Sequence, residues 1–351
     1  MIKVLIVDDS QTAQVLLNKI LSADPNIQVI GTANNGMQAL DFINKQKPDL
    51  ITMDLHMPGM NGLEVTRRIM ESKPCPIIIV SSSWNSANKA EVFDYLEAGA
   101  VSAIEKPNRL ADPEFEELCK TLVQTVKLMS EIKVVRRLPL TKSRRATVGD
   151  RSASGQEVKM ICIGASTGGP PVLRTILAAL PSDIPVPILI VQHIAKGFLP
   201  GLADWLNEST PLTVKIAKDG EDMRAGHVYL APDGSDMGIQ KPRRIFLKNP
   251  KLGQSLCPSV SFLFHSAANN FGSEVIAILL TGMGSDGAED LHLLKAKGAT
   301  TIAQEKDSCV VFGMPGEAVK LGAAMHILPP DKIAEMIETT LKYRLKTEQK
   351  R

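Results

Sequence analysis

Residues 160–170 read MICIGASTGGP, and the order of residue types in this stretch predicts the local structure. Apolar residues run to Ile163, and a turn of small residues that contains one serine, Ser166, follows them. Two prolines and the apolar pattern VLRTILAAL (172–180) come next and indicate a helix, because proline is tolerated in a first helical turn. The stretch therefore predicts a buried strand, a tight turn and a helix, which is the repeating unit of α/β folds.

The same alternation extends over both halves of the chain. From Met1 to about Ser130, five short apolar runs alternate with five amphipathic patterns, which predicts a parallel sheet covered by helices on both faces. The alternation restarts near Val158 and predicts a second α/β domain. Short runs separated by Gly and Pro around 213–247 predict an antiparallel excursion within it. No convincing repeat relates the two halves.

Composition limits the classes of function. The chain has 351 residues, of which 44% are hydrophobic and 22% charged, as expected for a soluble globular protein of about two domains. Its apolar runs are shorter than the roughly 20 residues of a membrane span, and its N-terminus has no signal-peptide layout, so we expect a cytoplasmic protein without membrane insertion. A net charge of +2 and 4% aromatic residues argue against a nucleic-acid partner.

Residues 131–157 lose the periodicity of the flanking segments. They contain seven Lys or Arg against three Asp or Glu, together with Ser and Gly, which is typical of an exposed basic linker. Either a solvated tether or a contact with an acidic partner fits this composition. We expect domains at residues 1–125 and 158–348, joined by a linker over 126–157.

Carboxylates follow two predicted strands of the N-terminal half. Asp8 and Asp9 come directly after KVLIV, and Asp54 follows DLITM, so the three should meet at the carboxyl edge of the sheet. Clustered carboxylates repel one another unless a cation joins them, and oxygen ligands suit Mg²⁺. Lys106 and Ser81, which also follow predicted strands, would add a positive charge and a hydroxyl. Together these residue types suit a phosphoryl group on a carboxylate.

The motifs VDD (7–9), MDLHMPGMNG (53–62) and KP (106–107) make this region similar to the receiver domain of response regulators. The resemblance covers about residues 1–125 and implies a flavodoxin-like (βα)5 fold. It implies that Asp54 accepts a phosphoryl group from a histidine kinase. It also implies that Mg²⁺ is bound by Asp8, Asp9 and Asp54, and that the phosphoryl group is contacted by Ser81 and Lys106.

Residues 164–168 fit the pattern G-x-S-x-G, in which a serine on a strand-to-helix turn exposes its oxygen. The N-terminus of the following helix would stabilise a developing oxyanion. The pattern alone is weak, because small residues at such turns often serve only close packing or phosphate binding. Ser166 also needs a base, and of six histidines only His193 follows a strongly apolar strand, PILIVQH.

A carboxylate would complete the site by orienting the imidazole. The strand EVIAILL is followed by TGMGSDG, which places Asp286 in a glycine-rich turn at the same expected edge. Three neighbouring strands would then deliver Ser166, His193 and Asp286 to one crevice. The rivals Glu289 and Asp290 are expected in the next helix, facing water.

The segment TGMGSDG (281–287) has a second interpretation. Its glycines spell GxGxxG between a strand and a helix, and Glu305 lies 18 residues beyond the last of them, near where a ribose-binding acid would sit. This pattern predicts a nucleotide site. The bulky Met283 between glycines and the negative charge of Asp286 argue against a pyrophosphate there.

GASTGGP, VQHI, PSVSFLF, TGMGSDGAEDL and TIAQEKDSCVVFGMPGEAV resemble the catalytic domain of chemotaxis protein-glutamate methylesterases, over about residues 158–345. The resemblance implies a doubly wound, mainly parallel α/β domain with a Rossmann-like sheet. It implies a nucleophile at Ser166, a general base and acid at His193, an orienting carboxylate at Asp286, and oxyanion support from Met283 with Thr167. The implied substrates are glutamate γ-methyl esters and certain glutamines of chemoreceptors, and no cofactor is needed for ester hydrolysis.

Three positions depart from the patterns of these families. Ala103 replaces an aromatic residue that many receivers carry three positions before the lysine, Asp236 stands where relatives commonly show histidine, and Cys309 replaces a small hydroxyl residue. None belongs to the expected triad. A phosphorylation-controlled adaptor with a degenerate hydrolase site stays open as an alternative. For the enzyme, we expect the unphosphorylated receiver to cover the catalytic crevice.

Overall fold

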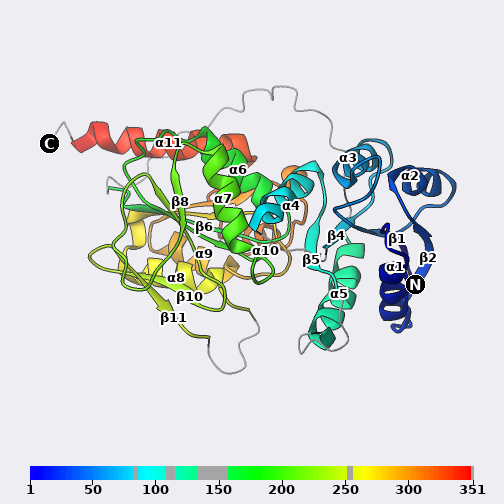
Figure 1. Ribbon diagram of the computed structural model, residues 1–351. Helices are drawn as coiled ribbons and strands as arrows, with labels where there is room; N and C mark the ends of the chain where they lie inside the picture. The colour runs from blue at the N-terminus through cyan, green and yellow to red at the C-terminus, as the bar shows by residue number, and fades with distance from the viewer. Residues whose placement is uncertain (82–85, 108–114, 133, 135–156, 251–255, 349–351) are drawn as a thin grey trace. The chain divides into compact units, whose positions relative to one another are not determined.

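The computed structural model describes residues 1–81, 86–107, 115–132, 134, 157–250 and 256–348 (Figure 1). The chain divides into two compact units, Met1–Arg145 and Ala146–Arg351. Within the described ranges, every helix is too short or too polar to cross a bilayer.

The N-terminal unit is a parallel sheet with the strand order β2-β1-β3-β4-β5. The prediction of five strands alternating with five helices is confirmed. The strands are β1 (Ile2–Val7), β2 (Ile27–Ala33), β3 (Leu50–Met53), β4 (Ile77–Ser81) and β5 (Ser102–Glu105). The helices are α1 (Gln11–Ser22), α2 (Gly36–Lys45), α3 (Gly62–Ser72), α4 (Ser86–Ala98) and α5 (Phe115–Ser130).

The last helix of this unit extends into the expected linker. Val126 and Met129 are buried on α5, and this apolar face carries the helix through Ser130. The first five residues of the range 126–157 are therefore helical. Most of the remaining linker lies outside the described residues.

The C-terminal unit is built on a seven-stranded parallel sheet with the order β14-β13-β12-β6-β7-β9-β8. Its strands are β6 (Met160–Ala165), β7 (Ile188–Gln192), β8 (Thr213–Ile216), β9 (His227–Leu230), β12 (Val275–Leu279), β13 (Thr300–Gln304) and β14 (His326–Leu328). The central strands β6, β7 and β12 are buried along their whole length, as expected for strands covered on both faces.

Helices lie on this sheet in two groups. Helix α6 packs against α7 and α11, whereas α9 packs against α8 and α10 (Figure 1). Their bounds are α6 (Gly169–Ala179), α7 (Leu199–Ser209), α8 (Val260–Asn270), α9 (Ala288–Ala296), α10 (Met314–Lys320) and α11 (Pro330–Glu348), with short 3-10 helices at Gly272–Glu274 and Lys306–Ser308. The predicted doubly wound α/β class is confirmed.

The antiparallel excursion predicted around 213–247 is only half right. Strands β8 and β9 pair in parallel within the main sheet, and only β10 (Asp236–Gln240) and β11 (Arg244–Lys248) form an antiparallel pair. The connection between β8 and β9, residues 217–226, is long enough to return the chain to the starting edge, so the second strand runs in the same direction as the first.

The direction of winding reverses at β6. From this strand the sheet continues through β7 on one side and through β12 on the other. In open α/β sheets, ligands bind beyond the carboxyl ends of the strands at such a switch point. The residues that follow β6, β7 and β12 therefore lie where a ligand would bind.

Candidate active site

Ser166 lies on the turn between β6 and α6. Its N–H donates to the Thr281 carbonyl at 3.0 Å, and its carbonyl accepts from the Gly169 N–H at 2.8 Å. Gly168 has a φ of +77°, and a Cβ added there would lie 2.5 Å from the Val310 side chain. Glycine is needed at this position both for backbone conformation and for space. The small residues of the G-x-S-x-G pattern thus form the tight turn that the sequence predicts.

His193 follows β7 directly, beside the serine turn. Its N–H donates to the Ala165 carbonyl at 2.9 Å, and Ala165 pairs with Gln192 in the sheet register. Ser166 and His193 are therefore adjacent positions just beyond two neighbouring strands. Among the residues that the structure describes, the Ser166 hydroxyl has no hydrogen-bond partner, so the contact between serine and histidine is not formed. Such contacts often tighten only when substrate binds.

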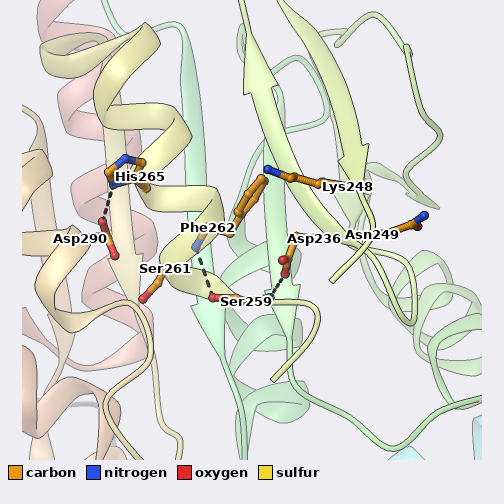
Figure 2. A pocket seen from close by; sticks show the side chains of 8 residues that line it. All are labelled: Asp236, Lys248, Asn249, Ser259, Ser261, Phe262, His265 and Asp290. Atoms are coloured by element: carbon orange, nitrogen blue, oxygen red, sulfur yellow. Dashed lines mark hydrogen bonds and ion pairs between the residues drawn. The ribbon is translucent and has the colours of Figure 1, made fainter. Parts of the chain in front are cut away.

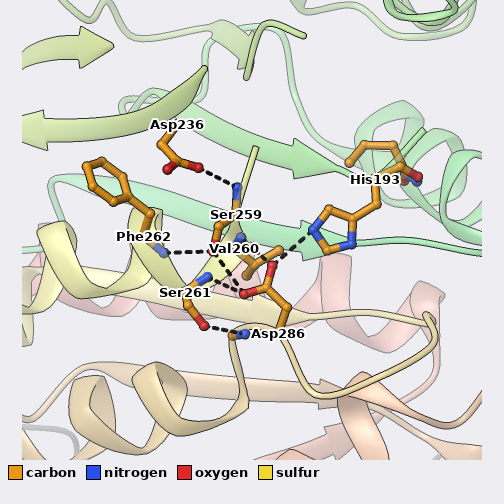
Figure 3. A network of polar contacts seen from close by, with 9 residues as sticks. His193, Asp236, Ser259, Val260, Ser261, Phe262 and Asp286 are labelled. Carbon is orange, nitrogen blue, oxygen red and sulfur yellow. Dashed lines mark hydrogen bonds and ion pairs between the residues drawn. The ribbon is translucent and has the colours of Figure 1, made fainter. Parts of the chain in front are cut away.

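Asp286 meets the histidine from the turn between β12 and α9. His193 Nε2 lies 3.0 Å from Asp286 Oδ2 (Figure 3). The distance is that of an ion pair, although the ring N–H is not aligned well enough for a regular hydrogen bond. With Nε2 facing the carboxylate, Nδ1 is the ring nitrogen left for a second partner.

The Asp286 carboxylate also caps the N-terminus of α8 (Figure 3). It accepts hydrogen bonds from the Ser259 hydroxyl at 3.0 Å, the Val260 N–H at 2.7 Å and the Ser261 N–H at 2.9 Å. Burial alone would raise the pKa of Asp286, but the contacts from His193 and Ser261 outweigh it and lower the pKa to about 2. The group is therefore a carboxylate at any neutral or mildly acidic pH.

The entry to α8 is fixed in turn by Asp236 and Ser259. Asp236 accepts the Ser259 N–H at 2.9 Å, and the Ser259 hydroxyl caps the helix by accepting the Phe262 N–H at 3.3 Å. Neither residue is predicted from the sequence to belong to the site. A serine before an apolar helical pattern is a recognisable N-cap signal, but nothing local shows that the cap also contacts a carboxylate in a turn that follows the next strand.

A pocket of about 370 Å³ lies beside the first turns of α8 (Figure 2). It is lined by Asp236, Lys248, Asn249, Ser259, Ser261, Phe262, His265 and Asp290. Two of these residues, Ser259 and Ser261, also contact Asp286. Asp290 and Glu289 both lie in α9, as expected. Glu289 is exposed, but the expectation that Asp290 faces water is wrong, because Asp290 Oδ1 pairs with His265 Nδ1 at 3.0 Å.

The residues expected to support an oxyanion border the serine turn. The Thr167 carbonyl accepts the Thr281 hydroxyl at 3.0 Å, which holds this residue beside the segment after β12. Met283 is 38% exposed and follows Gly282, where an added Cβ would lie 2.6 Å from Ser166 Cβ. Both residues therefore lie in segments next to Ser166, and their contribution to an oxyanion site stays a prediction.

The N-terminal unit gathers its charged residues at the carboxyl edge of its sheet. One oxygen each from Asp8, Asp9 and Asp54 lies within 4.8 Å of the others. Lys106 Nζ lies 2.7 Å from Asp8 Oδ2 and 3.1 Å from Asp54 Oδ1. Burial raises the pKa of Asp54 despite the attraction of Lys106. Ser81 ends β4, and its carbonyl accepts the Lys106 N–H at 2.8 Å.

This cluster fits a hard divalent cation. Among the described residues, Lys106 is the one cation paired with this cluster, and it contacts two of the three carboxylates, those of Asp8 and Asp54. Negative charge is therefore left to neutralise, and carboxylate oxygens are the ligands that Mg²⁺ takes. Asp8 and Asp54 are buried, while Asp9 is exposed and leaves the site open to solvent. The geometry suits the magnesium-dependent chemistry that the sequence predicts.

Comparisons with known proteins agree with both halves of this description. Residues 161–337 match the family model for the CheB methylesterase, and residues 4–114 match the response regulator receiver domain. The chain is 45% identical over 344 residues to a protein-glutamate methylesterase/protein-glutamine glutaminase of Syntrophus aciditrophicus, covering 96% of this chain and 97% of the relative. The chain belongs to the CheB methylesterase family.

Other relatives support the same membership. A protein-glutamate methylesterase/protein-glutamine glutaminase of Geobacter metallireducens is 47% identical over 336 residues, which is 95% of this chain and 97% of that protein. The crystal structure of the Thermotoga maritima CheB methylesterase catalytic domain is 40% identical, with a TM-score of 0.50, and covers 52% of this chain and 98% of the domain. The chain is thus a response regulator of the methylesterase family, and the resemblance found in the sequence is confirmed.

Proposed function

We propose that this chain is a phosphorylation-regulated hydrolase that removes methyl groups from glutamate γ-methyl esters, and deamidates certain glutamines, on the cytoplasmic helices of chemoreceptors. Family membership supports the enzyme class. The observation that carries the proposal for the site is the 3.0 Å contact between His193 and Asp286, beside the turn that exposes Ser166.

The proposed chemistry uses three side chains. Ser166 Oγ attacks the ester carbonyl while His193 accepts the serine proton, and because Nε2 faces Asp286, Nδ1 is the nitrogen that would accept it. His193 returns the proton to the departing methanol, and a water molecule then cleaves the acyl-enzyme by the same route in reverse. Asp286 stabilises the charged imidazole without taking a proton, since its pKa of about 2 keeps it ionised.

The carbonyl oxygen becomes negative during both steps. The N-terminus of α6, which begins at Gly169 directly after the serine turn, offers a positive dipole end. Its first N–H groups are not available, because the Gly169 N–H donates to the Ser166 carbonyl and Pro170 and Pro171 have none. Thr167 and Met283 are the other proposed contributors. The proposed ester hydrolysis uses no metal or cofactor.

Regulation is proposed to run through the receiver. Asp54 would accept a phosphoryl group from a chemotaxis histidine kinase, with Ser81 and Lys106 contacting the phosphoryl oxygens. Asp8, Asp9 and Asp54 would hold Mg²⁺, which when bound neutralises charge on the transferred group. We place the reaction in the cytoplasm, where kinase and receptor helices meet, with no nucleic-acid partner.

Release of methanol from methylated receptor membranes tests the proposal. We expect release by the wild-type chain and its loss in Ser166→Ala. Equal release by both proteins would favour the alternative, an adaptor whose hydrolase site is degenerate. Addition of a phosphodonor with Mg²⁺ should raise the rate of the wild type and leave that of Asp54→Asn unchanged.

A further inference from the structure

A buried glutamine joins the two segments that carry the proposed nucleophile and base. Gln192 is the last residue of β7 and is only 4% exposed. Its Nε2 donates to the carbonyl oxygens of Ser166 and His193, each at 2.8 Å. Because both partners are acceptors, this atom must be the amide nitrogen rather than the oxygen. One side chain thus uses both of its N–H groups on the backbone of the catalytic segments.

The oxygen atom of the same amide, Oε1, lies against Gly169, directly after the serine turn. A Cβ added to Gly169, the first residue of α6, would lie 2.1 Å from Gln192 Oε1. Within the described part of the chain, this buried oxygen receives no hydrogen bond. A buried acceptor without a donor costs free energy, and this cost offsets part of what the two Nε2 hydrogen bonds contribute to stability. The net gain in stability from Gln192 is therefore smaller than its two hydrogen bonds alone would give.

The serine turn is held on its opposite side by the segment after β12. The Ser166 N–H donates to the Thr281 carbonyl at 3.0 Å, and the Thr281 N–H donates to Gln304 Oε1 at 2.8 Å. Gln192 supplies the corresponding attachment from the β7 side. Without its Nε2, the Ser166 carbonyl would keep the Gly169 N–H alone among the described residues, and no other side-chain hydrogen bond in that part of the chain would join the turn to the His193 segment.

We propose that Gln192 is a positioning residue that sets the approach of Ser166 to His193. The proposal rests on the proposed roles of these two residues as nucleophile and base. Proton transfer from the serine requires the oxygen and the imidazole nitrogen within about 3 Å of each other, and a misplacement of roughly 1 Å costs on the order of 100-fold in rate. Gln192 acts through the backbone of both residues and does not contact the reacting atoms.

The first test replaces Gln192 by a side chain of similar length without donors. In the full chain, Gln192→Met should lower the rate of Ser166 labelling by a fluorophosphonate about 100-fold. The kcat for p-nitrophenyl acetate should fall by a similar factor, with KM little changed. Labelling at the wild-type rate would overturn the proposal.

A matched control separates positioning from general stability. Asn270 also donates through one amide nitrogen to two backbone carbonyls, those of Ile239 at 3.1 Å and Ser266 at 2.9 Å, at the far end of α8. Asn270→Leu should lower the thermal unfolding temperature and leave the labelling rate unchanged. A labelling defect in Asn270→Leu as large as that in Gln192→Met would overturn the assigned role, because loss of any amide that donates to two backbone carbonyls would then suffice.

A double-mutant cycle tests the positioning role of Gln192 even if Gln192→Met folds poorly. A Cβ at Gly169 would lie 2.1 Å from Gln192 Oε1 and 2.9 Å from Ala165 Cβ, so Gly169→Ala should slow labelling. In the Gln192→Ala background only the milder Ala165 contact is left, and the same substitution should cost less than it does in the wild type. Additive losses would contradict the proposal. The proposed function is tested separately from the role of Gln192. If Ser166→Ala is labelled as fast as the wild type, Ser166 is not the nucleophile. If Ser166→Ala is not labelled but Gln192→Met is labelled at the wild-type rate, only the role of Gln192 is rejected.

Discussion

The Val260 N–H lies 2.7 Å from Asp286 Oδ2, the same oxygen that lies 3.0 Å from His193 Nε2. The start of α8 therefore contacts the carboxylate that faces the imidazole. An anion at a helix N-terminus is stabilised by unpaired N–H groups and by the helix dipole. This arrangement keeps Asp286 charged and fixed in place while leaving it able to stabilise a histidine cation.

Asp286→Asn should lower kcat for methanol release on the order of 10³- to 10⁴-fold, because an amide cannot stabilise the imidazolium. The control is Asp290→Asn, since Asp290 lies four residues further on and pairs with His265 instead. Steady-state kinetics on both variants would measure this. A loss of less than tenfold in Asp286→Asn, or equal losses in both, would remove Asp286 from the mechanism.

The lowered pKa of Asp286 also predicts how stability depends on pH. The pKa falls from 3.8 to about 2 on folding, so the ionised group stabilises the folded state at pH values above about 4. This contribution, about 2 kcal/mol, is lost as pH falls toward 2. The difference in unfolding free energy between wild type and Asp286→Asn, measured in urea, should stay constant from pH 7 to 5 and narrow below 4. Narrowing already between pH 7 and 5 would be inconsistent with a pKa of about 2.

Ser259→Ala removes a hydroxyl that donates to Asp286 at 3.0 Å and caps α8. We expect a loss of about 1–2 kcal/mol in unfolding free energy. The decrease in kcat should be smaller than for Asp286→Asn, because the Val260 and Ser261 N–H groups still hold the carboxylate. Ser209→Ala, which removes a hydroxyl near the end of α7, serves as the control and should change stability little. Equal destabilisation by both would argue against the cap.

Removal of divalent cations should affect the phosphorylation of the N-terminal unit but not the hydrolytic site of the C-terminal unit. With EDTA, phosphorylation of Asp54 by acetyl phosphate should stop, while labelling of Ser166 by a fluorophosphonate continues at the basal rate. Calorimetry should show Mg²⁺ binding that is lost in Asp8→Asn and retained in Asp41→Asn, an exposed carboxylate on α2. Inhibition of basal labelling by EDTA would contradict a hydrolytic site that works without metal.

The sequence is most informative where a candidate functional residue comes directly after a strand. Ser166 and His193 come one residue after β6 and β7, so apolar periodicity alone placed them at one edge. Asp8 and Asp54 follow β1 and β3 in the same way. Parallel strands bring their carboxyl ends together, and this is why a one-dimensional pattern predicts a three-dimensional cluster.

Contacts between distant segments were not predictable in this way. The Ser259 hydroxyl donates to Asp286, which is 27 positions away in the sequence, and Asp290 pairs with His265, which is 25 positions away. Both contacts depend on how α8 and α9 pack, which residue spacing does not specify. The parallel pairing of β8 with β9 is not predictable for a related reason, because short strands separated by Gly and Pro fit a hairpin and a crossover equally well.

The account depends most on Ser166 being activated by His193, and covalent trapping tests this directly. After reaction of the full chain with a fluorophosphonate, peptide mass spectrometry should find one adduct, on the peptide that contains Ser166. The rate of its formation should fall at least about 100-fold in His193→Gln. An adduct on another serine, or an unchanged rate in His193→Gln, would contradict the proposed active site.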